Sequence, residues 1–229
     1  MKTFNNKIEE SKNSSKNKKN FKELVGDKVI LRPFVKSDIT MEYISWLNDP
    51  DVVRYSNQRF VRHTKKTCFK YFNSFKRTNN ILAIILRRSD LCPIGTITAY
   101  QNIQHGTADV GILIGDKSAW GSGYGQNAWN TLIDWLVKRK KIRKVCAGTF
   151  ENNRAMIKII NRAGMKMEAI LKHHEIADGA VLNILLYSKF TQFHYQELKR
   201  LSKSNASVKS SYKKRSNIDH RVKERDAKQ

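Results

Sequence analysis

The sequence predicts an α+β (mixed α/β) fold with a largely antiparallel central sheet. Three apolar, strand-like runs follow one another within residues 81–114, which is typical of an antiparallel meander. A glycine-rich turn and a helical pattern come directly afterwards, and two further strand-like runs end the apolar part of the chain. Helical patterns placed before and after a block of strands indicate an α+β domain.

The first 75 residues combine a polar segment with a strand and helices. Residues 1–24 are rich in Asn, Lys and Ser, so we expect a disordered basic segment followed by one domain over residues 25–190. Ser37 or Asp38 is expected to cap the first helix. The elements predicted here are a strand at 28–34, a helix ending at 48–50, a helical turn at 51–55 and a helix at about 65–75.

The remaining elements follow from periodicity and from turn residues. Asp178-Gly179 predicts a two-residue hairpin turn between the last two strands. Residues 191–229 are predicted to be a basic, mostly disordered tail, although Tyr195, Leu198 and Leu201 have helical spacing. The elements predicted are strands at 81–86, 93–100 and 107–114, a helix reaching about residue 140, a strand at 143–150, a helix at 152–162 closed at Gly164, and strands at 165–175 and 180–190.

The chain is strongly basic, with 44 Lys and Arg against 20 Asp and Glu and a net charge of +24. Such a surface can simply be well solvated, but its field also attracts anionic ligands, nucleic acid and anionic surfaces. It argues against polyamine or aminoglycoside substrates, which need acidic pockets. We expect weak contact of the basic tails with nucleic acid or an anionic surface.

The cysteines give no sign of a metal site. Cys68, Cys92 and Cys146 are far apart, and the last two lie in apolar strand-like runs, so buried free thiols in a reducing compartment are expected. No stretch approaches the length of a membrane span, and the N-terminus lacks an apolar signal region. We therefore expect a cytoplasmic monomer or homodimer with no metal and no transmembrane segment.

The stretch from Ala108 to Ala128 carries the main functional signal. An apolar strand leads into Gly121, Gly123 and Gly125, and a helical pattern follows at once. Backbone N–H groups at such a turn and the helix dipole together bind anions, so a cofactor phosphate is the expected ligand. The order G-S-G-Y-G is not the dinucleotide fingerprint, and no Lys-Ser/Thr pair follows it as in a P-loop.

Several motifs together resemble the GNAT acetyltransferase superfamily over roughly residues 27–190. They are L-R-P-F, W-L-N-D-P-D-V-V-R-Y-S, G-I-L-I-G-D-K-S-A-W-G-S-G-Y-G and E-N-N-R-A-M-I-K-I-I-N-R-A-G-M. The resemblance is closest to the RimJ/RimL-like branch, and within it to amino-sugar N-acetyltransferases. It implies acetyl-CoA as co-substrate, a splayed pair of strands in the sheet and about four flanking helices.

The resemblance also implies cofactor contacts. The glycine turn would hold the pyrophosphate, the backbone at the end of the preceding strand would bind the pantetheine and the thioester carbonyl, and an asparagine would lie beside the pantetheine arm. Each set also has a purely structural explanation. The glycines could form a tight turn, the strand residues could pack in the core, and the asparagine could be an N-cap that binds the Met156 N–H. The residues concerned are Leu113, Ile114, Trp120, Gly121, Ser122, Gly123, Tyr124, Gly125 and Asn153.

The acid and base residues of the family do not carry over. Its tyrosine, serine and glutamate would fall at Ile160, Met156 and Gly148, none of which can transfer a proton. The remaining candidates for proton transfer near the expected cleft are Glu151, His173, Glu175 and Tyr187. Each also has a structural alternative. Glu151 could be a charge at a helix start, His173 and Glu175 could be exposed strand residues, and Tyr187 could be a core aromatic.

A weak acid/base set suits an amino-sugar amine, because ring oxygens make that amine less basic than lysine. We therefore expect an N-acetyltransferase for a primary amine, best a nucleotide-linked or surface-polysaccharide amino sugar. The alternatives are an N-terminal acetyltransferase of ribosomal or other proteins, and a non-catalytic acetyl-CoA-fold protein that binds nucleic acid through its tails. The expected acceptor-binding residues are Asn48, Arg54, Tyr55 and Arg59.

Overall fold

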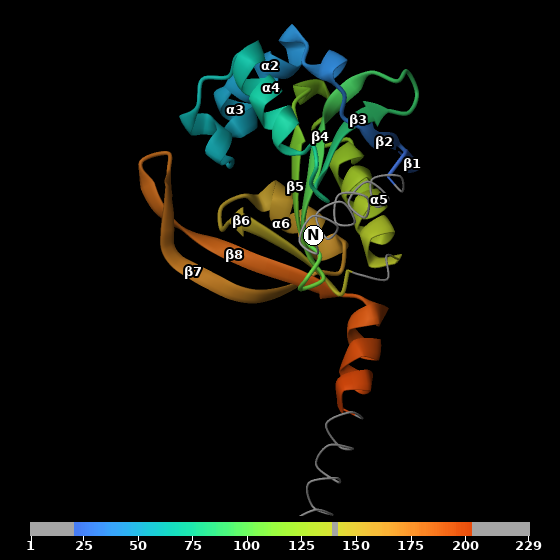
Figure 1. The fold of residues 1–229 in the computed structure, drawn as a ribbon. Helices are drawn as coiled ribbons and strands as arrows, with labels where there is room; N and C mark the ends of the chain where they lie inside the picture. The colour runs from blue at the N-terminus through green and yellow to red at the C-terminus, as the bar shows by residue number, and fades with distance from the viewer. Residues whose placement is uncertain (1–20, 139–141, 203–229) are drawn as a thin grey trace, which may run out of the picture.

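The fold is built on one eight-stranded sheet, seen in a computed structural model that describes residues 21–138 and 142–202 (Figure 1). The strand order is β1-β2-β3-β4-β5-β6-β8-β7, and β5 and β6 form its parallel pair. The predicted α+β fold with a largely antiparallel sheet is confirmed. The strands are β1 (Leu24–Val25), β2 (Val29–Pro33), β3 (Ile81–Arg87), β4 (Pro93–Asn102), β5 (Thr107–Ile114), β6 (Lys144–Phe150), β7 (Lys166–Ala177) and β8 (Ala180–Phe190).

Helices cover both faces of the sheet, and most of them lie where the periodicity predicts. They are η2 (Lys36–Asp38), α2 (Met41–Asn48), α3 (Pro50–Val53), η3 (Asn57–Phe60), α4 (Lys65–Ser74), η4 (Lys117–Ala119), α5 (Tyr124–Lys138) and α6 (Arg154–Arg162). Residues 192–202 are also helical, in agreement with the spacing noted there. Most of the predicted N-terminal segment and of the predicted tail lies outside the described residues.

Strand β3 is apolar throughout because both of its faces are covered. Ile81, Ala83 and Ile85 belong to the core cluster that includes the buried side of α5. The alternate residues Leu82, Ile84 and Leu86 belong to a second cluster with α2 and α4. Successive side chains of a strand point to opposite faces, so a strand covered on both faces reads as an unbroken apolar run.

The first helix starts later than predicted. Its N-cap is Thr40, whose side chain accepts a hydrogen bond from the Tyr43 N–H. Asp38 cannot serve because its carboxylate is bound by Arg32, at 2.7 and 2.8 Å, and by the backbone N–H of Val35. The predicted cap at Ser37 or Asp38 is therefore wrong.

The prediction of a buried Cys92 is also wrong. Strand β3 ends at Arg87 and β4 begins at Pro93, so Cys92 lies in the connecting turn and is exposed. Cys68 is buried and Cys146 half-buried, and burial raises the pKa of both thiols. Those two thiols will be poorly reactive near neutral pH.

Strands β5 and β6 separate along their length, which creates the predicted splayed pair. They are paired between Thr107 and Asp109 on β5 and between Lys144 and Cys146 on β6. The pairing stops there, although β5 continues to Ile114 and β6 to Phe150. The opening between the two strands thus lies at their carboxyl ends, where both the glycine turn and the start of α6 are found.

Strands β7 and β8 form a long hairpin that extends past the rest of the sheet (Figure 1). Its turn is Asp178-Gly179, with φ of 52° and 73°, so the predicted two-residue turn is confirmed. The register shifts between Leu171 and Glu175, where residues 172–174 oppose Asn183 alone. This bulge bends the hairpin toward α3 and η3, which it meets at its tip.

Candidate active site

The glycine turn contains two residues in the left-handed backbone region. Gly121 and Gly123 have φ of 74° and 84°, a region that other residues rarely adopt. A Cβ built on Gly121 would meet no atom within 4 Å, so glycine is needed there for its conformation and not for lack of space. Helix α5 begins at Tyr124, directly after the turn, and its first N–H groups point toward it.

Gly125 lies where α5, α6 and β5 converge. A Cβ at this position would lie 3.4 Å from Cδ1 of Ile159 and 3.5 Å from Cγ1 of Ile114. The side chain of Gln126 donates a hydrogen bond to the Ile159 carbonyl at 3.2 Å. The first turn of α5 is therefore fixed against both walls of the opening.

Two basic side chains that the sequence analysis did not predict lie beside the turn. The Lys28 ammonium donates to the Ser122 carbonyl at 3.0 Å and lies 5.9 Å from the Tyr124 ring centre. The Arg87 guanidinium is 5.8 Å from the same ring and bonds Asp116 at 2.9 Å. Lys28 is 94 residues from Ser122, so no local motif could reveal it.

The end of β5 presents backbone groups to the opening. The Gly115 N–H faces β4, where it bonds the Ile94 carbonyl at 2.9 Å. Because backbone groups alternate along a strand, those of Ile114 face the opposite way, into the opening. Trp120 donates its indole N–H to the Ile114 carbonyl at 2.9 Å and so ties the glycine turn to the end of the strand.

Asn153 caps α6 at the other side of the opening. Its side chain accepts a hydrogen bond from the Met156 N–H at 3.2 Å, as expected of an N-cap. Its predicted contact with the cofactor stays a prediction. Leu113 packs against the cluster formed by α2 and α4, so its side chain is part of the core.

Glu151 lies at the far side of the opening, level with Ile114. Each is five residues beyond the last paired position of its strand, Cys146 and Asp109 respectively. The Glu151 carboxylate accepts hydrogen bonds from the backbone N–H and the side-chain amide of Asn183, at 2.8 and 2.9 Å. These bonds anchor Glu151 to β8, and its predicted catalytic role stays a prediction.

Asn183 connects Glu151 to the bulge in β7. Its side-chain oxygen accepts a hydrogen bond from the His173 N–H at 2.8 Å, and His173 has a φ of 50°. The His173 side chain is exposed, and its predicted role stays a prediction. Asn183 was not predicted, because the sequence gives no sign of which bulge residue it would face.

Tyr187 and Ile160 both lie in the main core cluster, with exposures of 6% and 0%. Ile160 occupies the position of the family tyrosine. It is buried in the core, and it has no hydroxyl group that could donate a proton. Tyr187 pairs with Ala147 on β6 and Met167 on β7. Its predicted catalytic role stays a prediction.

A hollow of ≈ 400 Å³ lies between the α2–α3 layer and the tip of the β7–β8 hairpin. It contains three of the four residues predicted to bind the acceptor, Asn48, Arg54 and Arg59, together with Arg62, which was not predicted. Arg62 follows the predicted segment by three residues, so a count of basic side chains there would have found it. The lining residues are Leu47, Asn48, Pro50, Val53, Arg54, Gln58, Arg59, Phe60, Val61, Arg62 and Asp178.

Two arginines join the wall of this hollow to the hairpin. Arg54 forms an ion pair with Asp178 at 2.7 Å. Arg59 donates to the Ile176 carbonyl at 3.0 Å and lies 3.5 Å from the Glu175 carboxylate. Its guanidinium also lies 5.2 Å from the ring centre of Phe150, the last residue of β6. The hollow therefore borders the opening of the splayed strands.

The other two predicted acceptor residues have structural contacts. The Asn48 side chain bonds the backbone of Ile44 and both backbone groups of His63, which joins α2 to the segment before α4. Tyr55 packs its ring 5.8 Å from that of Phe150 and is not part of the lining. Their acceptor-binding roles stay predictions.

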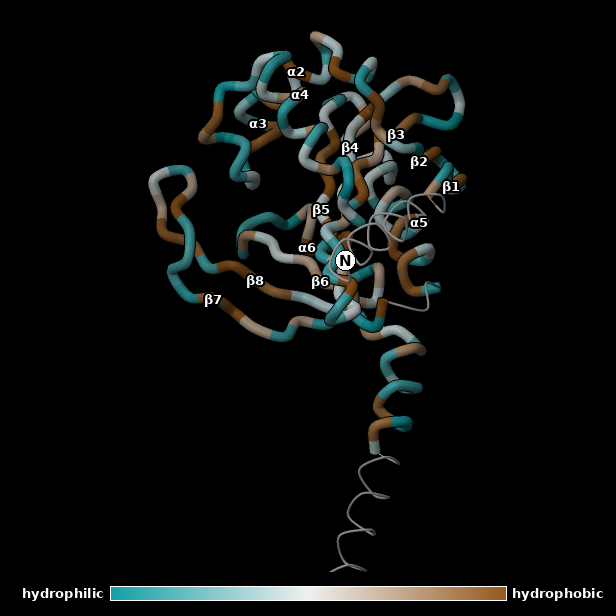
Figure 2. The backbone as a smooth tube through the Cα atoms, in the orientation of Figure 1, coloured by the Kyte–Doolittle hydropathy of each residue, from teal (hydrophilic) through white to brown (hydrophobic). Residues whose placement is uncertain are grey.

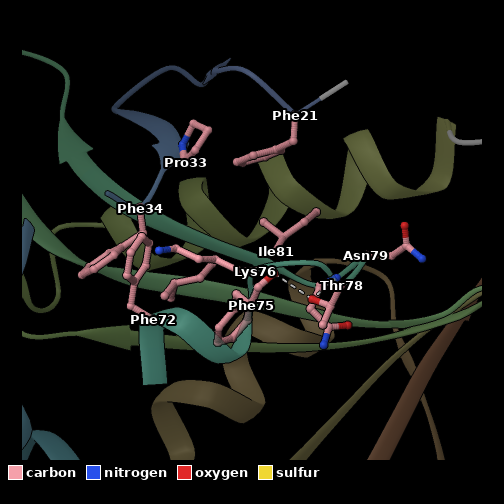
Figure 3. A pocket seen from close by; sticks show the side chains of 11 residues that line it. Phe21, Pro33, Phe34, Phe72, Phe75, Lys76, Thr78, Asn79 and Ile81 are labelled. Carbon is pink, nitrogen blue, oxygen red and sulfur yellow. Dashed lines mark hydrogen bonds between the residues drawn. The ribbon is translucent and has the colours of Figure 1, made fainter. Parts of the chain in front are cut away.

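A second hollow, of ≈ 250 Å³, lies at the edge of β3 next to the end of α4 and is mainly apolar (Figure 3). Phe34, Phe72 and Phe75 form one wall, and Lys76 extends across it. None of the predicted site residues lines it. Within the described residues there is no group of His, Cys, Asp and Glu side chains arranged to hold a metal ion. The helices of that same part are all too short or too polar to cross a membrane.

The chain was compared with protein families and with curated proteins, and both comparisons point to acetyltransferases. Residues 28–166 match the "Acetyltransferase (GNAT) domain". A similar curated protein is the uncharacterized N-acetyltransferase p20 of Bacillus licheniformis, 25% identical over 158 residues, which span 66% of this chain and 85% of p20.

Solved structures have the same fold at low sequence identity. The ribosomal L7/L12 alpha-N-protein acetyltransferase RimL, in complex with coenzyme A, has a TM-score of 0.67 and 16% identity over 75% of this chain and 99% of RimL. The microcin C7 self-immunity acetyltransferase MccE, in complex with acetyl-CoA and AMP, has a TM-score of 0.63 and 17% identity over 72% of this chain and 93% of that one.

Proposed function

Because this chain belongs to the GNAT acetyltransferase family, we propose that it transfers the acetyl group of acetyl-CoA to a primary amine on an anionic molecule. The best candidate is an amino sugar linked to a nucleotide or destined for a surface polysaccharide. The observation that carries this proposal is the lining of the acceptor hollow, where Arg54, Arg59 and Arg62 are gathered. Asp178, the acid of that lining, is already paired with Arg54.

The residues at the splayed strands fit acetyl-CoA. Gly121 and Gly123 have the positive φ that lets backbone N–H groups converge on a phosphate, and the start of α5 adds its dipole. Lys28 stands beside the turn with its ammonium 3.0 Å from the Ser122 carbonyl, where it can reach an anion held by the turn. Bound there, acetyl-CoA supplies an activated acetyl group as a thioester.

The chain contributes positioning and electrostatics to the transfer. The Ile114 N–H faces the opening between β5 and β6, where it can donate to the oxygen that gains charge during acyl transfer. Trp120 holds the neighbouring carbonyl group at 2.9 Å and so keeps that N–H in place. A preorganised donor of this kind accelerates acyl transfer without a covalent enzyme intermediate.

Proton transfer is assigned to Glu175. Its carboxylate lies 3.5 Å from Arg59, which lines the acceptor hollow, and its side chain is 28% exposed. Glu151, by comparison, has both oxygens bound to Asn183. A sugar amine needs little help in losing its proton, so one partly exposed carboxylate is sufficient.

The proposal is tested by following thiol release from acetyl-CoA with several amines. UDP- and GDP-linked amino sugars should be acetylated faster than the free sugars, and both faster than N-terminal peptides or spermidine. Turnover with peptides alone would refute the sugar assignment and support the N-terminal acetyltransferase. Absence of turnover with any amine would support a non-catalytic role.

A pair of variants tests the hollow itself. Arg62→Gln should raise the KM for the nucleotide-linked acceptor about tenfold, because a charge-assisted hydrogen bond is lost. Arg162→Gln, at the end of α6 and outside the hollow, is the matched control and should have no effect. Equal effects of the two changes on acceptor KM would show that only the overall charge matters.

A further inference from the structure

The helix over residues 192–202 leaves the body of the protein and extends away from it (Figure 1). Its start is firmly attached, because Thr191 is buried and bonds the backbone of Arg143 and Ile142 at 2.9 and 2.8 Å. The His194 ring then stacks on Phe190, with 4.3 Å between ring centres. The helix therefore starts from a fixed point on the sheet.

This helix has an apolar side and a charged side. At 100° per residue, Tyr195 and Leu198 lie 60° apart on one side, and Arg200 falls on the opposite side, where it pairs with Glu197 at 2.9 Å. Tyr195 is 57% exposed and Leu198 is 51% exposed. Hydrophobic and hydrophilic stretches alternate along the tube of this helix (Figure 2). Two large apolar side chains one helical turn apart give this helix a short apolar strip of the kind that lies at a headgroup boundary.

We propose that the helix over residues 192–202 docks this protein on an anionic membrane surface. Residues 203–229, which follow it in the sequence, contain nine Lys and Arg against three Asp and Glu, so the charge complements anionic lipid headgroups. Insertion of Tyr195 and Leu198 at the boundary between headgroups and acyl chains would add the apolar contribution. An RNA partner would use the same basic residues but would leave these apolar side chains unused.

The inference is independent of the acceptor, because it concerns a surface outside both the glycine turn and the acceptor hollow. Two weak contributions, one electrostatic and one apolar, add to each other, as they do in anchors that combine an acyl chain with a polybasic patch. The protein would then work at a surface while its sheet and its active site remain in solvent.

The test is co-sedimentation of the full chain with vesicles of phosphatidylcholine containing about one third phosphatidylglycerol, against pure phosphatidylcholine vesicles. We expect binding to the anionic vesicles that weakens as salt rises. The neutral change Leu198→Gln should weaken that binding about fivefold, because it removes an apolar side chain without changing charge. Met41→Gln, a change at a 78% exposed apolar residue on α2, is the matched control and should bind normally.

Three results would overturn the proposal. Equal binding to neutral and anionic vesicles would exclude the charge contribution, and normal binding by Leu198→Gln would exclude insertion of the helix. Absence of vesicle binding together with a salt-sensitive shift of RNA would assign the basic tail to nucleic acid instead. Thermal melting of both variants checks that each is folded.

Discussion

The two sides of the opening between β5 and β6 are built in different ways. On the proposed cofactor side, the groups expected to bind are backbone atoms of one continuous stretch, from Ile114 through the glycine turn into α5. On the proposed acceptor side, the wall is made of side chains from α3, η3 and the adjoining residues, held against the tip of the β7–β8 hairpin by Arg54 and Arg59.

This difference determines how specific each side can be. Backbone N–H groups recognise a phosphate whatever the nearby side chains are, so a turn of this kind can serve enzymes of different acceptor choice. Arg54 and Asp178 are 124 residues apart in the sequence and meet only in the folded chain. A change in one arginine can therefore alter the acceptor while the cofactor side stays the same.

The largest effect is expected for Gly121→Ala. Alanine is disfavoured at a φ of 74°, and any shift of the turn moves N–H groups away from the phosphate, so the KM for acetyl-CoA should rise on the order of 100-fold. Gly179→Ala is the matched control, because that residue also has a φ of 73° and open space around a built Cβ. Both variants should lose similar stability in thermal melts. Similar KM values for acetyl-CoA in the two variants would show that the glycine turn does not bind the cofactor.

The same contrast explains what could be predicted from the sequence. The order of strands and helices, the turn at Asp178-Gly179 and the splayed strands follow from local periodicity and from motifs, and the structure bears them out. The cap of α2 was misplaced because Arg32 binds Asp38, a contact between side chains that no local pattern reveals. Lys28 and Asn183 were missed for the same reason, since their partners are distant in the sequence.

The next largest effect tests the acceptor wall. Arg59→Ala removes the bonds to the Ile176 carbonyl and to Glu175, so kcat/KM for the acceptor should fall about 30-fold with the KM for acetyl-CoA unchanged. Arg143→Ala is its control, because that arginine also bonds a backbone carbonyl, of His105, but lies near the start of β6. A parallel rise in the acetyl-CoA KM would mean that the two sides are not independent.

A smaller effect is expected for Glu151→Gln. This variant distinguishes a structural role of the Glu151 carboxylate from a role as the general base. If the carboxylate only anchors Glu151 to β8, the variant should lose about 1–2 kcal/mol in the free energy of unfolding, and its turnover should fall less than tenfold. Asn183→Ala should give a similar loss of stability, because it removes the partner of Glu151. A reduction in turnover by two orders of magnitude or more, with loss of the acidic limb of the pH profile, would instead identify Glu151 as the base.

The smallest effect concerns Asp116, at the junction of the two sides between β5 and the glycine turn. The hydrogen bond from Ser118 and the pairing with Arg87 lower the pKa of this carboxyl group, against the opposing effect of burial. A carboxyl group with a lowered pKa in the folded state stabilises the protein above its unfolded pKa, and this contribution is lost as the pH falls through the folded value. Asp116→Asn keeps a residue that can cap η4, so it should lower stability at pH 7 by less than about 1 kcal/mol. The difference from wild type should shrink as the pH falls below the unfolded pKa of the carboxyl group. Ser118→Ala, which leaves the carboxylate in place, should retain part of the pH dependence in melts recorded from about pH 3 to 7. A difference for Asp116→Asn that stays constant over this range would show that the charge of Asp116 contributes nothing to holding the glycine turn.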